Sequence, residues 1–457
     1  MKALPRGPSM FMPSMVRYLV DPYGVFRALA RKYGDPFLLP IPGTPGSLVT
    51  CSADGARAII AADRSQFTPL TNDATTRLFG NASIFVLHGD AHHDARKLMT
   101  PPLHSRRLAA YGDIMESIVT HHIDAWRPGD IVPLHQVAHR ITLDVILRVL
   151  FGIEPHTARA QRFHDALDAG LDSLGPIFLH AKFLRRAFGG HGPWARALRL
   201  VDDMRAALMA EIALHRERAG TEDVLDGFLA ARYDDGSAMT DLEIRDRLAD
   251  LIIAGHETTA VTLAWAFYEL VRSPGALDRL VDELDAHWTG PAPDQLAALP
   301  YLDAVCQETM RLHPGVVFLS RRLARPLEIQ GYHCPAGMAV SMALPVIHTD
   351  ARVFADPLRF VPERFVGRTY APAEFLPFGG GHKRCMGPAF ALHEMKVTLA
   401  TVLRAYRIAA ARDRSSPARP RTITVVPRDG VDVRVVERRA RITNETAAAP
   451  SALRAAR

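Results

Sequence analysis

The sequence predicts a mainly α-helical protein with small β-sheets, in the α+β class. Apolar residues recur at helical spacing over most of residues 111–230. One helix of about 33 residues, roughly 50 Å long, is predicted between Thr240 and Ser273. Short apolar segments bounded by Pro and Gly predict strands near both ends of the chain and after residue 315. With 457 residues, of which 48% are hydrophobic, the chain can bury a large core.

The N-terminal part alternates between helices and short strands. Helices are expected at 21–33, at 53–62 and from Gly89 onward, and strands at 37–41 and 47–51. A Pro- and Gly-rich turn joins the two strands. The segment between them and Gly89, residues 66–88, has no regular pattern. Long irregular segments inside a compact domain are often functional.

The C-terminal part carries clear start and stop signals. Thr240-Asp241-Leu242-Glu243 is a capping box, and Ser273-Pro274-Gly275 ends the helix that it begins. A shorter helix is expected from Pro300 to His313. The remaining strands are expected in a β-rich stretch at 315–319, in a small sheet over 327–340, and in a terminal hairpin made of 422–426 and 431–436.

Composition excludes several classes of protein. The four cysteines are scattered without C-x-x-C spacing, which argues against a disulfide framework or a zinc cluster and favours a reducing compartment, here the cytoplasm. The net charge is +6, but no basic run interleaved with aromatic residues indicates nucleic-acid binding. The most apolar 20 residues, Leu251 to Leu270, include His256, Glu257 and Glu269, so we expect a buried helix and no membrane span.

A glycine-rich loop with one cysteine precedes the last long helix. It reads Phe378-Gly379-Gly380-Gly381-His382-Lys383-Arg384-Cys385-Met386-Gly387. The cysteine lies just before a helix N-terminus, where N–H groups and the helix dipole favour a thiolate. The glycines allow the backbone to approach a flat ligand closely. The pattern is typical of a metal ligand or a nucleophile.

The middle of the long helix departs from ordinary helix composition. It reads Ala254-Gly255-His256-Glu257-Thr258-Thr259. A glycine inside a helix costs about 1 kcal/mol relative to alanine. The Thr258 hydroxyl can also bond the carbonyl of Ala254 and bend the helix. Such departures inside a well-specified helix tend to mark function.

These motifs resemble those of the cytochrome P450 family, in its soluble bacterial type. The cysteine loop resembles the family's haem-binding loop, and A-G-x-E-T-T resembles its oxygen-activation motif. Glu308-x-x-Arg311, with Arg364 of a later P-E-R-F, resembles its structural charge network, and His92-x-x-x-Arg96 resembles its propionate-binding helix. The resemblance implies one haem domain over residues 1–438 with the P450 fold, followed by a disordered tail at 439–457.

The family assigns roles to the matching residues. Haem b would lie between the long central helix and the helix after the cysteine loop, with the Cys385 thiolate on the iron. Glu257 and Thr258 would be catalytic and deliver protons, while Glu308, Arg311 and Arg364 would be structural. The remaining cofactor-binding candidates are His92, Arg96, Ala254, Gly255, Arg322, Phe378, Gly379, Lys383 and Gly387. Lys383 stands where the family usually has Arg or His, and Arg321 competes with Arg322 as a propionate ligand.

The implied activity is a monooxygenase that inserts one oxygen atom of O₂ into a C–H bond, by hydroxylation or epoxidation. The sequence shows no flavin or iron–sulfur module, so electrons from NAD(P)H would arrive through a ferredoxin and its reductase or through a flavodoxin. We expect a monomer. The candidate docking residues are Arg96, Lys97, Arg106, Arg107, Lys383 and Arg384.

The candidate substrate pocket is apolar and favours a hydrophobic guest such as a fatty acid, terpenoid, steroid or polyketide. Its predicted wall residues are Ile84, Phe85, Val86, Phe178, Ile253, Ala254, Val316, Val317, Phe318 and Ile423. The alternatives are a peroxide-driven hydroxylase and a non-catalytic haem-thiolate sensor, which would need no acid–alcohol pair. A metallohydrolase is disfavoured because no H-E-x-x-H motif is present.

Overall fold

The computed structural model describes residues 4–41, 44–70, 73–103, 105–173, 192–218, 223–413 and 415–439. The side chains at 73–74, 105–107 and 169–173 are not described. The predicted pocket residue Phe178 and the predicted tail beyond Arg439 lie outside the described residues.

Helices make up most of the described chain, as predicted. The longer helices are α1 (Phe11–Val20), α2 (Gly24–Tyr33), α3 (Ala53–Ala61), α4 (Asp73–Phe79), α5 (Gly89–Met99), α6 (Ser105–Ile123), α7 (Leu134–Phe151), α8 (Ala158–Ser173), α10 (Pro193–Glu217), α11 (Val224–Ala230), α12 (Asp241–Arg272), α13 (Pro274–His287), α15 (Pro300–Leu312) and α17 (Pro388–Ala405). The shorter helical turns are α14 (Pro293–Ala297), α16 (Leu344–Ile347), η1 (Arg64–Gln66), η2 (Pro101–Leu103), η5 (Pro362–Phe365) and η6 (Gly381–Lys383).

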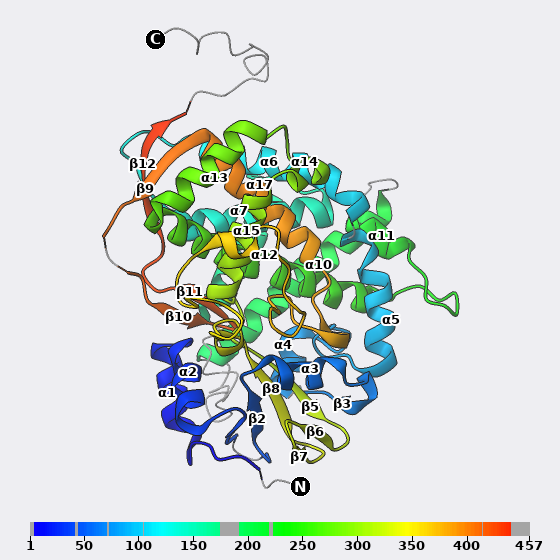
Figure 1. The fold of residues 1–457 in the computed structure, drawn as a ribbon. Helices are drawn as coiled ribbons and strands as arrows, with labels where there is room; N and C mark the ends of the chain where they lie inside the picture. Colours follow the sequence, from blue (N-terminus) through cyan, green and yellow to red (C-terminus); the bar gives the residue numbers. More distant parts are fainter. Residues whose placement is uncertain are drawn as a thin grey trace.

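The strands form small sheets. They are β1 (Phe37–Leu39), β2 (Ser47–Thr50), β3 (Phe67–Thr68), β4 (Ile131–Pro133), β5 (Phe318–Leu323), β6 (Leu327–Ile329), β7 (Tyr332–Cys334), β8 (Ala339–Ala343), β9 (Tyr406–Ala410), β10 (Ala418–Arg421), β11 (Thr424–Pro427) and β12 (Asp432–Arg438). The largest sheet has the order β1-β2-β8-β5-β3 and lies with α1, α2 and α3 at the lower end of Figure 1, while the helices fill the upper part.

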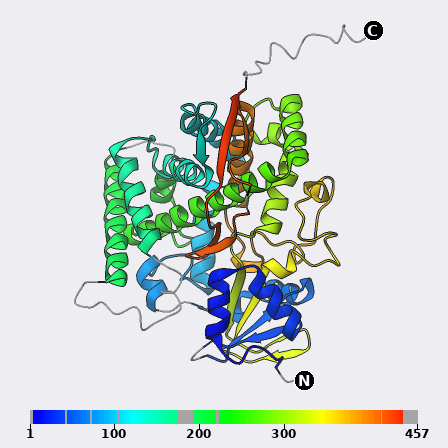
Figure 2. The same cartoon turned by 90° about the vertical axis from the view of Figure 1, so that its left-hand side faces the viewer.

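Helix α12 organises the molecule. Its capping box is present, because the Thr240 side chain accepts a hydrogen bond from the Glu243 N–H and the Glu243 carboxylate accepts one from the Thr240 N–H. The helix has 32 residues, close to the predicted length. Figure 2 shows it in green, crossing the middle of the molecule, and it packs against α7, α10, α15 and α17. Elements from both halves of the chain therefore meet on this one helix.

Strand β5 connects the main sheet to the cysteine loop. It pairs antiparallel with β8, with Leu319 opposite Met342 and Arg321 opposite Val340. Successive side chains of a strand point to opposite faces. Leu319 and Arg321 therefore lie on one face of the sheet, whereas Ser320 lies on the other.

The predicted terminal hairpin is wrong. β11 pairs with β10, and β12 pairs with β9 and with the distant β4. Val433 and Val435 of β12 are fully buried in the helical core, and this burial explains why the strand joins that layer instead of β11. Ile423 therefore lies in the short turn between β10 and β11.

Two other local predictions need correction. The segment 66–88 is not wholly irregular, because it contains β3 and α4. The predicted helix 21–33 starts only at Gly24 and is preceded by the unpredicted helix α1. None of the helices in the described ranges combines the length and apolar composition needed to cross a membrane.

Candidate active site

The cysteine loop has a shape that depends on its glycines. Gly379 and Gly381 have φ angles of 69° and 65°, in the left-handed region that favours glycine. A Cβ atom on Gly381 would lie 2.6 Å from the carbonyl oxygen of Ile60, and one on Gly380 would lie 2.7 Å from the Ile60 side chain. The loop can therefore lie directly against α3 only because these residues lack side chains.

Hydrogen bonds within the loop position the cysteine. The Cys385 N–H donates to the carbonyl oxygen of Phe378 (2.9 Å), and the Gly387 N–H approaches the Cys385 Sγ at 3.4 Å. Helix α17 begins at Pro388, so the sulfur lies at its N-terminus, as predicted.

Cys385 differs from the other cysteines in its surroundings. Cys51, Cys306 and Cys334 are buried, whereas Cys385 is accessible to solvent. The thiol lies in a recess, and burial raises its pKa; the Gly387 N–H and the charge of Arg96 oppose this rise only in part. The N–H groups and positive charges of the loop thus act in the expected direction, toward the thiolate, while burial acts against it. A coordinating metal ion deprotonates a thiol outright.

The residues in the middle of α12 differ in their surroundings. Ala254 is exposed and Thr258 is half-buried, four residues apart on one side of the helix. The Thr258 hydroxyl donates to the Ala254 carbonyl oxygen (2.7 Å), as expected. Gly255 was predicted to leave room for the cofactor, but a Cβ there would lie 3.1 Å from Ile146 of α7. Gly255 therefore allows the close packing of two helices.

Glu257 is buried, whereas Ala254 is exposed and Thr258 is half-buried. Glu257 is 3% exposed, and its Oε1 lies 3.4 Å from the Thr424 hydroxyl and 3.7 Å from the Arg421 guanidinium. Its Oε2 lies 3.6 Å from His139 Nε2. The acid and the alcohol are adjacent in sequence but face different surroundings. Sequence reasoning gave no signal for these three neighbours, which come from α7 and from the β10–β11 hairpin.

A cluster of cationic and imidazole groups surrounds the cysteine loop. Burial, together with the positive charges of Arg321 and Arg96, lowers the pKa of Lys383 to about 7. Burial and the charge of Lys383 lower the pKa of His92 to about 3 and that of His88 to about 4. No ion pair within the described chain neutralises Lys383, Arg321 or Arg96.

His382 belongs to the same cluster. It stacks on Phe67, with ring centroids 5.3 Å apart, and meets His92 edge to face at 6.3 Å. Burial and the charge of Arg321 lower its pKa to about 4. Neither His382 nor His88 was predicted as a site residue, although His382 lies within the quoted loop.

The structure distinguishes the two neighbouring arginines of β5. Arg321 lies on the same face as Leu319, whose side chain would lie 3.3 Å from a Cβ on Gly379 of the loop. Arg322 instead lines a large cavity with Ser320. Of the two candidates that the sequence left open, Arg321 therefore lies on the face of the cysteine loop, because strand alternation points Arg322 to the other face.

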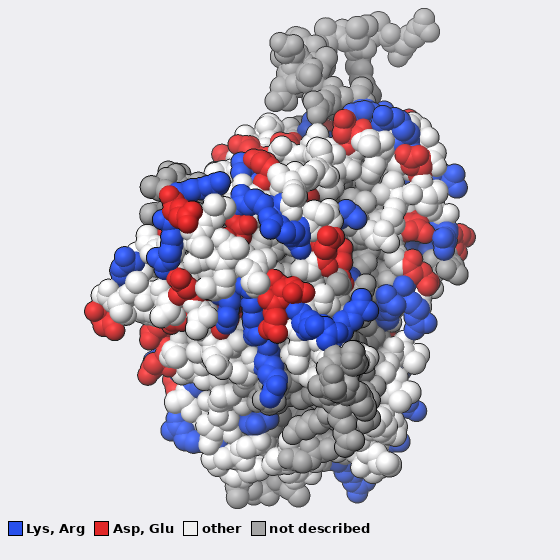
Figure 3. Space-filling view, turned by 180° about the vertical axis from the view of Figure 1, so that it is seen from behind, with Lys and Arg blue, Asp and Glu red and all other residues white. Residues whose placement is uncertain are grey.

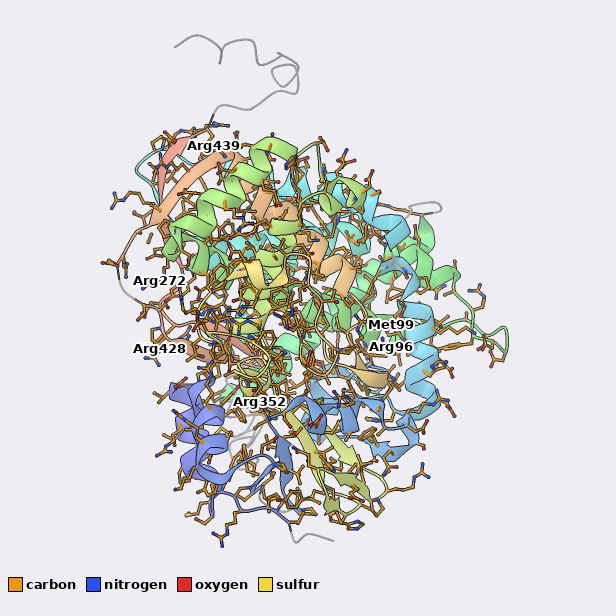
Figure 4. All side chains as sticks on the ribbon, in the orientation of Figure 1. Arg96, Met99, Arg272, Arg352, Arg428 and Arg439 are labelled. Carbon is orange, nitrogen blue, oxygen red and sulfur yellow. The ribbon has the colours of Figure 1, made fainter. Side chains whose placement is uncertain are left out.

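Lys383 and Arg96 both bond backbone oxygens near the loop. The Lys383 ammonium donates to the carbonyl oxygens of Leu87 (2.9 Å) and Ile84 (3.3 Å). The Arg96 guanidinium donates to the carbonyl oxygen of Arg384 (2.7 Å), and Figure 4 shows Arg96 beside Met99 on α5. Both side chains therefore join α5 and the preceding turn to the cysteine loop.

These residues fit a haem. The thiol supplies an axial ligand for iron, and the cluster of Arg321, Lys383, Arg96 and His92 supplies positive charge and N–H donors without carboxylate partners. A macrocycle with two propionates provides the missing negative charge. The exposed Ala254 on α12 offers a small side chain toward a flat ligand.

The predicted charge network is present, and both carboxylate oxygens of Glu308 accept hydrogen bonds. Arg311 donates to both oxygens of Glu308 (2.6 and 2.8 Å), and Arg364 donates to Oε1 at 3.0 Å. The Val361 N–H also donates to Oε1 at 2.8 Å. Glu308 and Arg311 are completely buried. The network ties α15 to η5 and to the segment that leads into the cysteine loop.

A cavity of about 640 Å³ lies between the main sheet, α1, α2, α10 and α12. Three predicted pocket residues, Ile253, Phe318 and Ile423, line it. Six do not: Ile84, Phe85, Val86, Ala254, Val316 and Val317. Val317 is buried in the core, and Ile84 is buried because its N–H and the Ser83 hydroxyl donate to Asp250 (2.6 and 2.7 Å).

Much of the cavity wall comes from elements that the pocket prediction did not include. α1 and α2 contribute Phe11, Tyr18, Phe26 and Leu29, and α10 contributes Met204. The alternating apolar pattern of α2 was visible in the sequence, but nothing local indicated which cavity it would face.

Comparisons with known proteins agree on one family. The family model described as Cytochrome P450 matches residues 5–433. The chain is 35% identical over 443 residues to "Putative cytochrome P450 135B1" of Mycobacterium tuberculosis, covering 94% of this chain and 91% of the relative. It is 32% identical over 426 residues to "Putative cytochrome P450 137" of the same species, covering 92% and 87%.

Solved structures show the same fold. The structure titled "Retinoic acid bound cyanobacterial CYP120A1" aligns with a TM-score of 0.84 and 24% identity, over 95% of this chain and 99% of that one. The haem domain of cytochrome P450DA aligns with a TM-score of 0.85 and 23% identity, over 95% and 98%. The predicted fold class and activity are thus confirmed. The chain belongs to the cytochrome P450 family and is a haem monooxygenase that uses O₂.

Proposed function

We propose that the chain hydroxylates a hydrophobic carboxylic acid, with electrons supplied by a separate ferredoxin or flavodoxin. The observation that carries the proposal is the cavity of about 640 Å³. Its wall is mainly apolar, and among the wall residues Arg322 makes no ion pair with any described residue. The cavity reaches α12 at Ala249 and Ile253, next to the exposed Ala254.

The site residues have distinct roles in this proposal. When bound, the haem supplies O₂ activation and oxygen transfer. Cys385 would hold the iron through Sγ, and Arg321, Arg96, His92 and Lys383 would hold the propionates. The other residues of the loop let the backbone lie flat against the macrocycle, as the φ angles of Gly379 and Gly381 support.

Thr258 and Glu257 supply protons in the proposed mechanism. The Thr258 hydroxyl lies on the open side of α12 and is oriented by its hydrogen bond to Ala254. Glu257 holds a proton at its buried carboxyl group and passes it on toward the hydroxyl. Arg421, Thr424 and His139 orient this carboxyl group at 3.4–3.7 Å.

Arg322 favours an acid over a neutral guest of equal size. A guanidinium facing an apolar wall is costly without an anion, and a carboxylate binds it with two parallel hydrogen bonds. Fatty acids match these requirements, as do acidic terpenoids and polyketides. The structural neighbour bound to retinoic acid holds a ligand of the same chemical class.

Electron delivery requires a face near the cysteine loop. Arg384 is exposed there, whereas Lys97 is paired with Asp234 (2.5 Å) and Lys383 is directed inward. The side chains of Arg106 and Arg107 are not described. Figure 3 shows acidic and basic residues interspersed on the face turned away from the viewer in Figure 1. Arg384 is the best-placed candidate for contact with an acidic partner.

The role of Thr258 is tested by Thr258→Ala. We expect less product and more hydrogen peroxide per NAD(P)H consumed, because the proton is no longer held beside the bound oxygen. Thr262→Ala is the matched control, since its hydroxyl makes the same kind of bond one turn later, to the Thr258 carbonyl oxygen (2.8 Å). If Thr258→Ala forms as much product per NAD(P)H as the unaltered protein, Thr258 has no role in proton delivery.

The substrate class is tested by comparing a long-chain acid with its methyl ester. Displacement of the iron-bound water is followed by the shift in the haem absorption band. We expect Arg322→Gln to weaken the acid about tenfold and to leave the ester unchanged. Arg205→Gln is the control, because Arg205 also lines the cavity but pairs with Asp202 (3.3 Å). Equal affinity for acid and ester in the unaltered protein would exclude the carboxylate contact.

A further inference from the structure

Three buried ligand atoms converge on the side of α12 that faces α7. One ring nitrogen of His139, one of His256 and a carboxylate oxygen of Glu257 all lie within 4.8 Å of one another. His139 comes from α7, and the other two residues come from α12. The distance between His139 Nε2 and Glu257 Oε2 is 3.6 Å. Residues far apart in sequence therefore bring two imidazoles and a carboxylate to one point.

The Nδ1 atoms of the two imidazoles each lie near an oxygen atom, and that of His256 makes a hydrogen bond. His256 Nδ1 lies 2.6 Å from the Ile252 carbonyl oxygen, so it must carry the proton and leave a lone pair on Nε2. His139 Nδ1 lies 3.7 Å from Asp168 Oδ1, which favours the same tautomer. The hydrogen bond of His256 is the arrangement found in metal-binding histidines, whose second nitrogen donates to a carbonyl or carboxylate oxygen. Asp168 lies near the corresponding nitrogen of His139 but beyond hydrogen-bond distance.

Both Nε2 atoms lack a hydrogen-bond partner in the described chain. His256 is completely buried and the His139 side chain is 8% exposed, so these atoms are shielded from bulk solvent. A buried polar atom without a partner costs about 1–3 kcal/mol. Two such atoms directed at one carboxylate indicate a ligand between them.

The Glu257 carboxylate is divided between two sets of neighbours. Its Oε1 lies near Arg421 and Thr424, and its Oε2 faces His139. Oε2 can therefore bind a cation while Oε1 keeps its contacts. This division also places the positive charge of Arg421 on the far oxygen of the carboxylate.

We propose that His139, His256 and Glu257 form a binding site for a divalent transition-metal ion, for which Zn²⁺ is the best fit. Two neutral imidazoles and one carboxylate are a common zinc ligand set, with a fourth position left for water. Bonds of about 2.0–2.2 Å place tetrahedral ligand atoms roughly 3.3 Å apart. The 3.6 Å separation of His139 and Glu257 is close to this value. Asp168, near His139, is exposed, so we expect an ion to reach the site from solvent on this side.

Metal binding at this site would remove Glu257 from proton transfer. The Oε2 atom cannot hold a proton and a metal ion together, so bound Zn²⁺ would lower monooxygenase turnover. This consequence rests on the proposed role of Glu257 in catalysis, whereas the metal site itself does not.

The test is equilibrium dialysis of the haem-loaded full chain against Zn²⁺, with the bound metal measured by mass spectrometry. His121→Ala is used as the background, because His121 and His156 are exposed with their Nε2 atoms 2.6 Å apart and form a competing surface site. We expect one Zn²⁺ per chain. Affinity should fall more than about 100-fold in His139→Ala and in His256→Ala, and 10–100-fold in Asp168→Asn.

His393→Ala is the matched control, because this buried histidine on α17 also has an Nε2 without a described partner but lies in no such cluster. It should bind Zn²⁺ like the background. Asp168→Asn alters an exposed side chain, so a folding defect cannot explain its loss of affinity. Equal binding by His139→Ala and the background, or no bound metal near 1 mM Zn²⁺, would overturn the proposal whatever the role of Glu257 in turnover.

Discussion

Glu308 and Glu257 are both buried glutamates, but their surroundings differ in kind. Glu308 receives four hydrogen bonds of 2.6–3.0 Å from Arg311, Arg364 and the Val361 N–H. Glu257 has its described neighbours His139, Arg421 and Thr424 at 3.4–3.7 Å. The exposed fractions are 0% and 3%, so burial alone does not separate the two.

This difference distinguishes a carboxylate that stabilises the fold from one that takes part in the reaction. Short bonds from two guanidinium groups and an N–H hold both oxygens of Glu308 in place, so this carboxylate joins separate segments of the chain. Contacts at the limit of hydrogen bonding orient the Glu257 carboxyl group and leave it able to accept or release a proton, or to bind a cation. The same residue type therefore holds the fold at one place and serves the reaction at another.

The largest expected effect comes from breaking the Glu308 network. Arg311→Ala leaves a fully buried carboxylate with half of its partners, and we expect a loss of about 3–5 kcal/mol in the free energy of unfolding. Urea unfolding of the haem-loaded protein, followed by circular dichroism, measures this loss.

Arg279→Ala is the control for that measurement. Arg279 pairs with Glu363 at 3.0 Å, but both side chains are about half exposed, so its removal should cost less than about 1 kcal/mol. Equal effects of the two variants would mean that burial does not set the strength of the Glu308 network.

Glu257→Gln should instead change turnover more than stability. We expect a fall of about 100-fold in product formation, because general acid groups contribute at least this much, with less than about 1 kcal/mol of destabilisation. Turnover is measured with a chelator present, so that a bound metal cannot contribute.

Glu269→Gln is the matched control on the same helix. Glu269 lies three turns later and pairs with His313 at 2.6 Å. It should leave turnover within a few-fold of the unaltered protein. A large stability loss in Glu257→Gln with no change in turnover would place Glu257 in the same class as Glu308.

Local sequence signals predicted the parts of the fold that depend on local interactions. The bounds of α12 followed from a capping box and a Ser-Pro-Gly stop, which act within a few residues. The pairing of β12 did not follow, because its partner β4 lies about 300 residues earlier and only burial selects it. The sequence left the choice between Arg321 and Arg322 open for a related reason. Alternation was visible, but which face meets the cysteine loop is set by the tertiary structure.

The candidate site shows the same limit. Motif spacing identified Cys385, Glu257 and Thr258 as candidates, because each motif is continuous in the sequence. His139 and Arg421, which lie within 4 Å of Glu257, belong to elements with no shared pattern. The cavity wall from α1 and α2 was missed because a cavity is defined by elements that meet only in the folded chain.

Asp144 is a third buried carboxylate, and its contribution to the free energy of unfolding should depend on pH. Burial by itself raises its pKa, but hydrogen bonds from His122 (2.7 Å) and His164 (2.8 Å) outweigh burial and lower the pKa to about 2. The folded state therefore binds the proton less tightly than the unfolded state does. This stabilisation, about 2 kcal/mol, is complete above pH 5 and is lost as the pH falls from about 4 through 2.

Asp144→Asn should accordingly lower the free energy of unfolding by about 2 kcal/mol at pH 7, and by about half as much at pH 3. Urea unfolding at the two pH values measures the difference. Asp124→Asn is the control, because Asp124 is 65% exposed in its pair with Arg438 and should change little at either pH. An Asp144 effect that does not depend on pH would show that the carboxylate is not held as an ion.

The smallest expected effects are those of replacing Arg321 or Arg322, two arginines whose surroundings also differ. Arg321 and Arg322 are neighbours on β5 with opposite faces, one toward the cysteine loop and one toward the cavity. Arg321→Gln should weaken haem retention about tenfold, the loss expected for one charge-assisted hydrogen bond, and leave the preference for acid over ester unchanged. Arg322→Gln should do the reverse. Haem transfer to apomyoglobin measures retention, and loss of haem from Arg322→Gln alone would return the propionate contact to Arg322.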